Sequence, residues 1–475
     1  MSLTLKHAPS RSGAFVASRV LSLALSLVPL LAVGSPASVP ANVVCVDADI
    51  VSAGNGQGWD VAFGELDDAL DAAASSGGQI TEIWVRAAQR AYVPGRRRGQ
   101  ALGDRTESFD LLDGVALFGG FLGDEMERDD RDPGLFHSTV LSGDRLEDDG
   151  PGFAGRSDNC YSVVCADAVG ASARIDGFRI RGGMADEPGR TDRGSGAGFY
   201  LASSSPIVEN CAFEENIAFL GSAMALWTDC LPLVRNCSFE LNGSTVSTGA
   251  VFIFERSNAR FEVCDFLHND GIRAAALFIE IADPVFVDCR FEANTGRTNG
   301  GAIASEDGAT IFDRCRFIEN ESSDAGAIYA DGNLGVFNCL FKGNRATTGE
   351  GGAMMIFRNA TDQLGGAAAS VGTLRRCCVE DLAGLLAATQ DPQAASPGNI
   401  RVGNFSIQPR FRDAAGGDFR LKEDSPCIDA GKVFAPIVGL SGSRDLDGLP
   451  RAVNWLHESR MAQGRVADIG AYELQ

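Results

Sequence analysis

The sequence has 475 residues and a formal net charge of −22, with 63 acidic side chains against 41 basic ones. Such an acidic chain repels a phosphate backbone, which argues against nucleic acid as a partner, and it also repels acidic polysaccharides unless cations bridge the carboxylates. Hydrophobic residues make up 45% and charged residues 22%, so a disordered chain is excluded. The 57 glycines predict many tight turns in a mostly β protein, and only 4 histidines argue against a His-based metal centre or triad.

The first 37 residues are predicted to form a secretory signal peptide. Lys6, Arg11 and Arg19 precede an apolar run over residues 20–33, and small residues follow it. Because that run is short for a membrane span and no later segment is long and apolar enough, we expect a protein that does not span the membrane after signal cleavage. Cleavage removes three basic side chains and moves the formal charge from −22 to −25. The expected location is the periplasm, the outer surface or the medium, with a retained N-terminal anchor as the alternative.

A Cys-x-Phe-x-x-Asn motif recurs between residues 210 and 344, as in "NCSFELN" at 236–242. Successive motif cysteines are 26, 27, 25, 26 and 24 residues apart, and a Gly-Ala element such as "GGAI" at 300–303 shares this period. A fixed period in this range is typical of a solenoid. The motif cysteines are Cys211, Cys237, Cys264, Cys289, Cys315 and Cys339. The motif asparagines are Asn216, Asn242, Asn269, Asn294, Asn320 and Asn344.

The spacing within the motif indicates which solenoid it builds. Cys and Phe, two residues apart, point to the same side of a strand, the residue between them is usually polar, and no helical stripe is present. We therefore predict an all-β fold, a single-stranded right-handed parallel β-helix of about ten coils, roughly 50 Å long at about 4.8 Å per coil. The β-helix is expected over residues 109–382.

Both ends of such a stack need covering, because unpaired strand edges invite aggregation. We expect an N-terminal cap region at 38–108, including a short helix at 64–76 with Leu66, Leu70 and Ala73 on one face. A C-terminal cap region is expected at 383–475.

The repeat resembles a known group. FxxN paired with a GG[AILV] element resembles the repeat of bacterial polymorphic outer membrane proteins. The segments "SPCIDAG" (425–431), "DLDGLPR" (445–451) and "DIGAYE" (468–473) look like the ending of secreted bacterial right-handed β-helix proteins with a choice-of-anchor Q domain. The resemblance implies the pectin-lyase-like fold, which hosts lyases, hydrolases, adhesins and proteins of unknown role. The Asp clusters and basic signatures of polygalacturonases and pectate lyases are not recognisable.

The cysteine ladder is predicted to pack inside the coils as a row of small hydrophobic side chains. A straight buried row lacks the tetrahedral geometry of a metal site, and in-register Cβ atoms about 4.8 Å apart exceed the roughly 3.8 Å of a relaxed disulfide. Elsewhere, Cys160 with Cys165, or Cys45 or Cys427 with some partner, remain candidates for disulfides in an oxidising compartment. Thirteen cysteines is an odd number, so at least one is free or pairs between chains.

The asparagine ladder is predicted to turn the coil corners. Asn tolerates the left-handed conformation that a corner needs, and stacked amides can hydrogen-bond from coil to coil.

Two groups of residues are candidates for chemistry. Asp265, Arg290 and Arg316 occupy equivalent outward positions on three successive coils and could hold an acidic sugar or act in catalysis; the alternative is a solvated charge pair of little energetic value. Asp445, Asp447 and Asp468, near the C-terminus, could bind Ca²⁺ through carboxylate oxygens, although Asp is also an ordinary turn residue. No other cofactor is expected.

The sequence thus favours a secreted or envelope-associated protein that binds polysaccharide or other cell-surface material. The alternative is a polysaccharide lyase or glycoside hydrolase with an unfamiliar active site along the helix groove, so whether the protein is an enzyme stays open. The ligand, the oligomeric state and the disulfide pairing are also left open.

Overall fold

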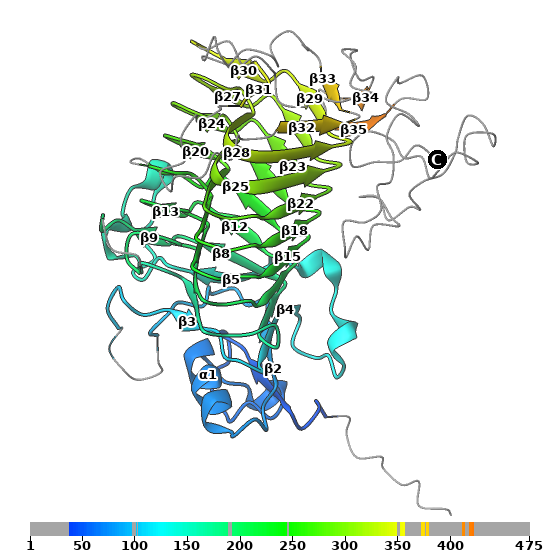
Figure 1. The fold of residues 1–475 in the computed structure, drawn as a ribbon. Helices are drawn as coiled ribbons and strands as arrows, with labels where there is room; N and C mark the ends of the chain where they lie inside the picture. Colours follow the sequence, from blue (N-terminus) through cyan, green and yellow to red (C-terminus); the bar gives the residue numbers. More distant parts are fainter. Residues whose placement is uncertain are drawn as a thin grey trace, which may run out of the picture. The chain divides into compact units, whose positions relative to one another are not determined.

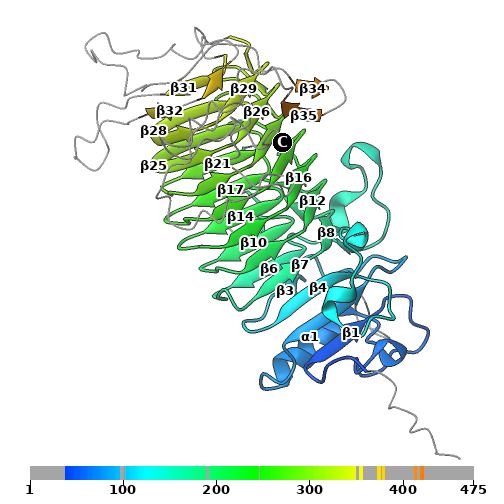
Figure 2. The same ribbon diagram turned by 90° about the vertical axis from the view of Figure 1, so that its right-hand side faces the viewer.

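The structure, a computed structural model, describes residues 38–96, 101, 103–188, 192–244, 247–348, 352–356, 372–375, 377–379, 411–413 and 418–421. Between residues 43 and 379 the chain winds through stacked coils whose strands pair in parallel with the equivalent strands of the coils before and after (Figures 1 and 2). The predicted all-β parallel β-helix is therefore confirmed.

The strands form four rows along the stack. The first row contains β3 (Phe109–Asp110), β6 (Val164–Asp167), β10 (Phe199–Ala202), β14 (Met224–Trp227), β17 (Val251–Phe254), β21 (Leu277–Glu280), the first halves of β25 (Ile303–Asp313) and β28 (Ile328–Phe337), and β31 (Met354–Ile356). The second row contains β1 (Val43–Val46), β2 (Glu82–Arg86), β4 (Ala116–Phe121), β7 (Arg174–Asp176), β11 (Ile207–Glu209), β15 (Leu233–Arg235), β18 (Arg260–Glu262), β22 (Val285–Val287), the second halves of β25 and β28, and β32 (Gly372–Arg375).

The third row carries the Cys-x-Phe motif. Its nine strands are β5 (Thr139–Ser142), β8 (Phe178–Arg181), β12 (Ala212–Glu214), β16 (Ser238–Glu240), β19 (Asp265–Leu267), β23 (Arg290–Glu292), β26 (Arg316–Ile318), β29 (Leu340–Lys342) and β33 (Cys378–Val379). The fourth row has two-residue strands: β9 (Met184–Ala185), β13 (Ile217–Ala218), β20 (Asp270–Gly271), β24 (Thr295–Gly296), β27 (Glu321–Ser322) and β30 (Arg345–Ala346).

The remaining elements lie outside these rows. They are α1 (Leu66–Ser75), the short 3-10 turns Trp59–Val61, Arg128–Asp130, Pro133–Leu135, Pro151–Phe153 and Arg156–Asp158, and the antiparallel pair β34 (Phe411–Asp413) and β35 (Asp418–Leu421). The rest of the predicted C-terminal cap region lies outside the described residues. Among the described residues, no helix has the length and apolarity to cross a membrane.

The third row follows the alternation read from the motif. Phe239 pairs in register with Phe213 and Phe266, and the six motif rings stack with centroids 4.6–5.0 Å apart and planes within 7° of parallel. The motif cysteines and phenylalanines are at most 3% exposed. Parallel stacking of identical rings at the strand spacing buries a continuous apolar column, which no single coil could bury alone.

The asparagine ladder joins every pair of neighbouring coils from Asn216 to Asn344. The backbone N–H and side-chain Nδ2 of Asn242 both donate to Oδ1 of Asn269, at 3.0 and 3.2 Å, and Nδ2 of Asn242 also donates to the carbonyl of Phe213 at 2.8 Å. The pattern repeats along the ladder, and the asparagines from Asn216 to Asn320 are at most 1% exposed. The amides thus satisfy buried backbone groups at each corner.

The ladder asparagines do not themselves adopt the left-handed conformation, so that part of the prediction was wrong. Positive φ falls instead on the residue before each one: Glu215, Leu241, His268, Ala293, Glu319 and Gly343, with φ of 52–63°. The asparagine side chain must point inward to reach the next coil, so the sharp change of direction is made one residue earlier. The side chain of that earlier residue is carried to the surface.

Helix α1 covers the first end of the coil stack, where the sequence predicted a helix. Its Leu66, Leu70 and Ala73 are buried in the same core cluster as interior strand residues such as Val44 and Ile83. In Figure 1 this helix lies at the blue, N-terminal end of the stack.

The described ladder thiols are buried and hydrogen-bonded. Sγ of Cys237, Cys264, Cys289, Cys315 and Cys339 donates to a carbonyl of the preceding coil at 3.6–3.7 Å, and burial raises the pKa of each of these thiols well above its usual value. Cys45, Cys160 and Cys165 are free thiols too, so the candidate disulfide between Cys160 and Cys165 is not formed. Cys427 lies outside the described residues.

We expect Asn269→Ala to lower the free energy of unfolding by about 2–3 kcal/mol, because two N–H groups of Asn242 lose their buried acceptor. Urea denaturation measures the change. Asn258→Ala is the control, since the exposed Asn258 side chain accepts the N–H of Asp283 and the loss of this one exposed bond should cost about 1 kcal/mol or less. Equal losses in the two variants would contradict a structural role for the ladder.

We expect the ladder thiols to be unreactive toward a thiol reagent such as DTNB in the native protein, because the reactive thiolate is suppressed and shielded. Unfolding in denaturant without reductant should release them. Failure of new thiols to appear in denaturant would show that the ladder is oxidised.

Candidate functional site

A long connection between β5 and β6, residues 143–163, interrupts the regular coils and includes two short 3-10 turns, Pro151–Phe153 and Arg156–Asp158. Its Asp144 carboxylate accepts the backbone N–H groups of Asp148 at 3.1 Å and Asp149 at 3.2 Å. The buried Asn159 donates from Nδ2 to the carbonyl of Gly182 at 2.6 Å, which ties the loop to the next coil. We call residues 143–159 the clasp loop.

The tip of the clasp loop holds a strained aromatic residue. Phe153 has φ of 66° and is 43% exposed, and it stands between Gly152 (φ 68°) and Gly155 (φ 88°). A bulky residue in the left-handed region is an energetic outlier that the surroundings must enforce, and such strain is concentrated at functional sites. In this conformation the apolar ring of Phe153 lies on the surface of an acidic protein.

Arg156 anchors the clasp loop against the coils. It is 5% exposed, its guanidinium lies 4.8 Å from the centre of the Phe153 ring, and its Nη1 donates to the backbone carbonyl of Glu215. The same guanidinium pairs with the carboxylates of Glu215 at 3.7 Å and Asp149 at 3.5 Å. Burial lowers the pKa of Arg156 and raises that of Asp149, for which burial outweighs the opposing effects of Asn159 and Arg156.

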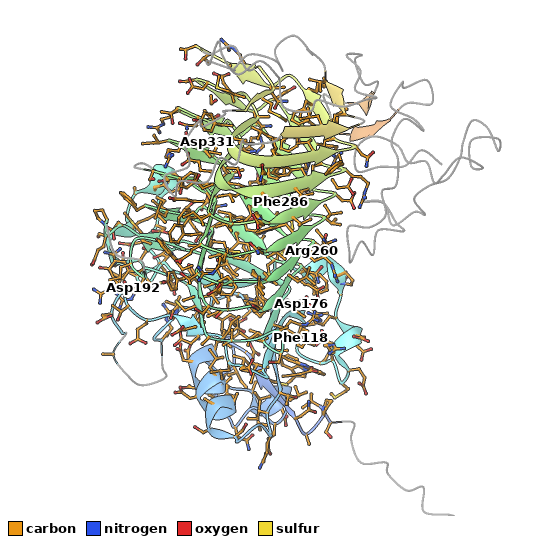
Figure 3. The ribbon with its side chains drawn as sticks, viewed as in Figure 1. Phe118, Asp176, Asp192, Arg260, Phe286 and Asp331 are labelled. Carbon is orange, nitrogen blue, oxygen red and sulfur yellow. The ribbon has the colours of Figure 1, made fainter. Side chains whose placement is uncertain are left out.

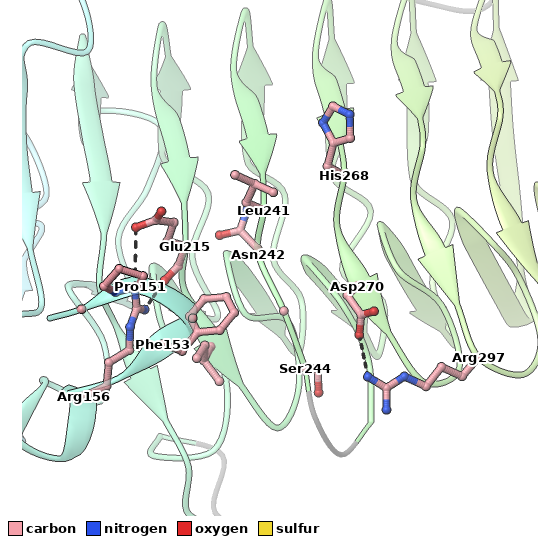
Figure 4. Close-up of a pocket in the computed structure, with 14 residues that line it drawn as sticks. Pro151, Phe153, Arg156, Glu215, Leu241, Asn242, Ser244, His268, Asp270 and Arg297 are labelled. Carbon is pink, nitrogen blue, oxygen red and sulfur yellow. Dashed lines mark hydrogen bonds and ion pairs between the residues drawn. The ribbon is translucent and has the colours of Figure 1, made fainter.

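Between the clasp loop and the coils lies a groove with a volume of about 520 Å³. One wall contains Phe153 and Arg156, and the other contains the left-handed turn residues Glu215, Leu241 and His268 of successive coils (Figure 4). The groove ends at Arg297 on the following coil. It therefore runs across the strands, along the axis of stacking, over four coils.

The charged side chains that line this groove are matched within the protein. Arg156 pairs with Glu215, Asp270 pairs with Arg297 at 3.1 Å, and Nδ1 of His268 lies 3.8 Å from Glu240. Leu241, 49% exposed, adds an apolar side chain opposite Phe153. The groove combines an apolar side chain on each wall with charged groups that are paired within the protein.

A second, more polar cavity of about 990 Å³ lies on the other side of Gly150 and Pro151. It shares Arg156 and Glu215 with the groove and adds Asp149 and Arg181 from the clasp loop and β8. Both volumes are in the range of small-ligand sites.

The three residues predicted as catalytic candidates do not line either cavity. Register places Asp265, Arg290 and Arg316 on successive coils as the motif indicated. Arg290 donates to both carboxylate oxygens of Asp265, at 2.9 and 2.8 Å, and Arg316 is only 2% exposed. Asp265 and Arg290 thus form a cross-coil charge pair, as in the alternative interpretation, whereas the predicted outward, solvated position of Arg316 was wrong because this side chain is buried.

The predicted Ca²⁺ ligands Asp445, Asp447 and Asp468 lie outside the described residues. Within the described part of the chain, Asp144, Asp148 and Asp158 bring carboxylate oxygens within 4.8 Å of one another. Oxygen donors of this kind suit Ca²⁺, but both Asp144 oxygens already accept backbone N–H groups.

Carboxylates also align on the outward face of the first strand row. Glu280, Glu306 and Asp331 (the last labelled in Figure 3) pair in register on successive coils. Burial raises the pKa of all three, and neighbouring acids raise it further. Arg273 hydrogen-bonds Glu306 and stacks on Phe278, 4.4 Å from its centre.

None of the sequence motifs indicated the clasp loop. Its signal was the stretch "DDGPGFAGRSDN", residues 148–159, where one Phe stands among glycines and acids at a point where a coil is lengthened. The wall residues Glu215, Leu241 and His268 occupy the variable position before each motif Asn, which the repeat itself leaves unspecified.

Comparison with protein families supports the fold. A family model described as a right-handed β-helix region matches residues 164–352, which begin at the start of β6 and end just before β31. The match agrees with the predicted handedness. A search of curated proteins found no match to this chain.

We expect Asp331→Asn to raise the melting temperature at pH 7 and to leave it unchanged at pH 3. Burial and the charge of Asp307 raise the pKa of Asp331 in the folded state above its ordinary value of 3.8. The protonated carboxyl group therefore stabilises the folded state fully below pH 3.8, and this stabilisation is lost as the pH rises through the raised pKa. Asparagine removes the cost of the buried charge only where Asp331 is ionised.

The opposite-sign control is Asp113→Asn, because hydrogen bonds from Ser172 and Gly170 lower the pKa of Asp113. That variant should be less stable than the parent at pH 7. A lower melting temperature for Asp331→Asn at pH 7 would contradict the assignment. Thermal unfolding followed by circular dichroism at both pH values measures these effects.

Proposed function

We propose that this chain is a secreted or envelope-associated β-helix protein that binds polysaccharide in the groove between the clasp loop and the coils. The observation that carries the proposal is the direction of the groove, which crosses four successive coils from Glu215 to Arg297 (Figure 4). Coils repeat at about 4.8 Å, so the site is elongated along one axis. A linear polymer lying along the stacking axis fits such a site.

The apolar side chains supply the expected contact with sugar rings. Phe153 is 43% exposed and Leu241 is 49% exposed, and both line the groove. Covering these side chains removes apolar surface from water, and an aromatic ring offers a flat face to the C–H face of a sugar. Polar groups at the rim then fix orientation, as in most ligand sites.

The charge pattern favours a neutral polysaccharide. The charged groups of the groove have opposite-charge partners, and the chain as a whole carries a formal charge of −22. An acidic glycan would face an unfavourable field and find no unmatched cation in the groove. This argues against a lyase acting on uronates, since such chemistry needs a site for the uronate carboxylate.

An extracellular setting is supported by the predicted signal peptide, residues 1–37, and by the resemblance of the repeats to those of polymorphic outer membrane proteins. The same acidity argues against nucleic acid as a partner.

We expect Leu241→Ala to weaken binding of neutral polysaccharide about fivefold, and Phe153→Ala about tenfold or more. Affinity electrophoresis against a soluble glucan, a mannan, a xylan and an arabinogalactan, with polygalacturonate and alginate as acidic counterparts, measures retention.

The matched control is Ile281→Ala. Ile281 has the same φ of 54° as Leu241 and is 46% exposed, but it does not line the groove. Equal loss of retention in both variants would contradict the groove as the site. If only the acidic glycans were retained, the proposal that the ligand is neutral would be wrong. If no glycan were retained, the proposed binding function would be wrong.

A further inference from the structure

The groove is lined by a second line of residues beside the wall residues Glu215, Leu241 and His268. These are Ile217, Gly243 and Asp270, which pair in parallel on three successive coils, and all of them line the groove. We call them the fourth-row positions, because they follow each ladder asparagine directly and belong to the fourth row of the coils. Each of the three coils therefore offers the groove the same two positions, one on either side of its ladder asparagine (Figure 4).

Gly243 is the middle one of the three fourth-row positions and has no side chain. A Cβ atom added there would meet no atom of the described residues within 4 Å, and the φ of Gly243 is outside the left-handed region. Neither crowding nor backbone conformation thus requires glycine at this position. A glycine in a strand-like position often marks the close approach of a ligand. Between Ile217 and Asp270 the groove therefore has room for a ligand group.

The coil spacing sets the distance between equivalent contacts along the groove. Neighbouring coils are about 4.8 Å apart. An extended 1,4-β-linked glycan advances by only slightly more than this distance for each sugar residue, so it stays nearly in phase with the coils over the three steps from Glu215 to Arg297. Chains with 1,3-β or 1,4-α links curve into helices and advance by less per residue, so they lose this register.

The side chains of the groove suit the shape of such a sugar residue. A 1,4-β-linked glucose residue is flat, with C–H groups on its two faces and hydroxyl groups around its edge. Phe153 on one wall and Leu241 on the other offer apolar contacts to the faces, and Gly243, on the same coil as Leu241, leaves space for the edge. The exposed pair of Asp270 and Arg297, 3.1 Å apart, has little energetic value by itself, so its groups can bond hydroxyls instead.

We propose that the groove selects an extended 1,4-β-linked glycan, holding one sugar residue per coil with the central residue over Gly243. This inference rests on the proposed function and names the linkage that the site selects. Gly243 is then a specificity-determining position, because any side chain there would occupy the space of the central sugar residue.

The test measures the affinity of the full chain for three series of neutral gluco-oligosaccharides, with 1,4-β, 1,3-β and 1,4-α links, by isothermal titration calorimetry. We expect the 1,4-β series to bind at least about tenfold more tightly than the other two. Its affinity should rise about fivefold from the disaccharide to the trisaccharide and change less than about twofold beyond the tetrasaccharide, because the groove ends at Arg297.

Gly243→Phe should weaken binding of the 1,4-β trisaccharide at least about tenfold, because the added ring fills the groove. The variant should keep the melting temperature of the parent, since its Cβ enters open space. The matched control is Thr295→Phe. Thr295 is the next fourth-row position, in register with Asp270, and it is exposed but does not line the groove. Its affinity should stay within about twofold of the parent.

Equal binding of the three linkage series, or tighter binding of the 1,3-β or 1,4-α series, would overturn the inference. Unchanged affinity in Gly243→Phe would also overturn it, as would equal losses in Gly243→Phe and Thr295→Phe. In each of these cases, retention of a neutral polysaccharide by the parent protein would leave the proposed function standing. A parent protein that retains no polysaccharide and binds no oligosaccharide would overturn both proposals.

Discussion

The hydrogen bond between stacked asparagine side chains sets the geometry on which the rest of the described coils depend. From Asn242 to Asn344, each Oδ1 accepts the backbone N–H and an Nδ2 proton of the asparagine one coil earlier, and each Nδ2 also donates to a phenylalanine carbonyl of that earlier coil. Because these amides are buried, an unmatched partner would be costly, and the corner is held in one conformation. In-register stacking of the Phe213–Phe341 column follows from the same constraint, since the motif Phe precedes each Asn by three residues.

Because the ladder asparagines must point inward, the residues before them form the surface of the candidate site. With the asparagine turned inward, the preceding residue takes the left-handed conformation and its side chain is exposed, as for Glu215, Leu241 and His268. The interior ladder and the groove wall are therefore two sides of the same turn. The clasp loop completes the site by setting Phe153 and Arg156 against that wall. The fold and the candidate site therefore use the same turn. The fold depends on the motif asparagine, and the site depends on the variable residue that precedes it.

The sequence predicted the parts of the molecule that repeat. Period and alternation placed Cys237 and Phe239 inside, and helical periodicity placed Leu66 and Leu70 on the buried face of α1. The corner conformation was assigned to the wrong residue because Asn has a high intrinsic tolerance for positive φ, whereas here its hydrogen bonds decide the matter. Arg156 and Asp149 could not be found from a pattern: they occur once, in an irregular loop, and their significance lies in contacts with Glu215 on a different coil.

The turn row that walls the groove continues past His268 through Ala293 and Glu319 at the same corner. Coil number, and with it the length of this wall, is set by how many times one 24- to 27-residue unit is copied. Duplicating or deleting a unit inserts or removes one asparagine, one phenylalanine ring and one wall residue together, so the interior stays satisfied at every length. The length of this wall can therefore be inherited as a copy number, while the residue before each asparagine is free to vary from unit to unit.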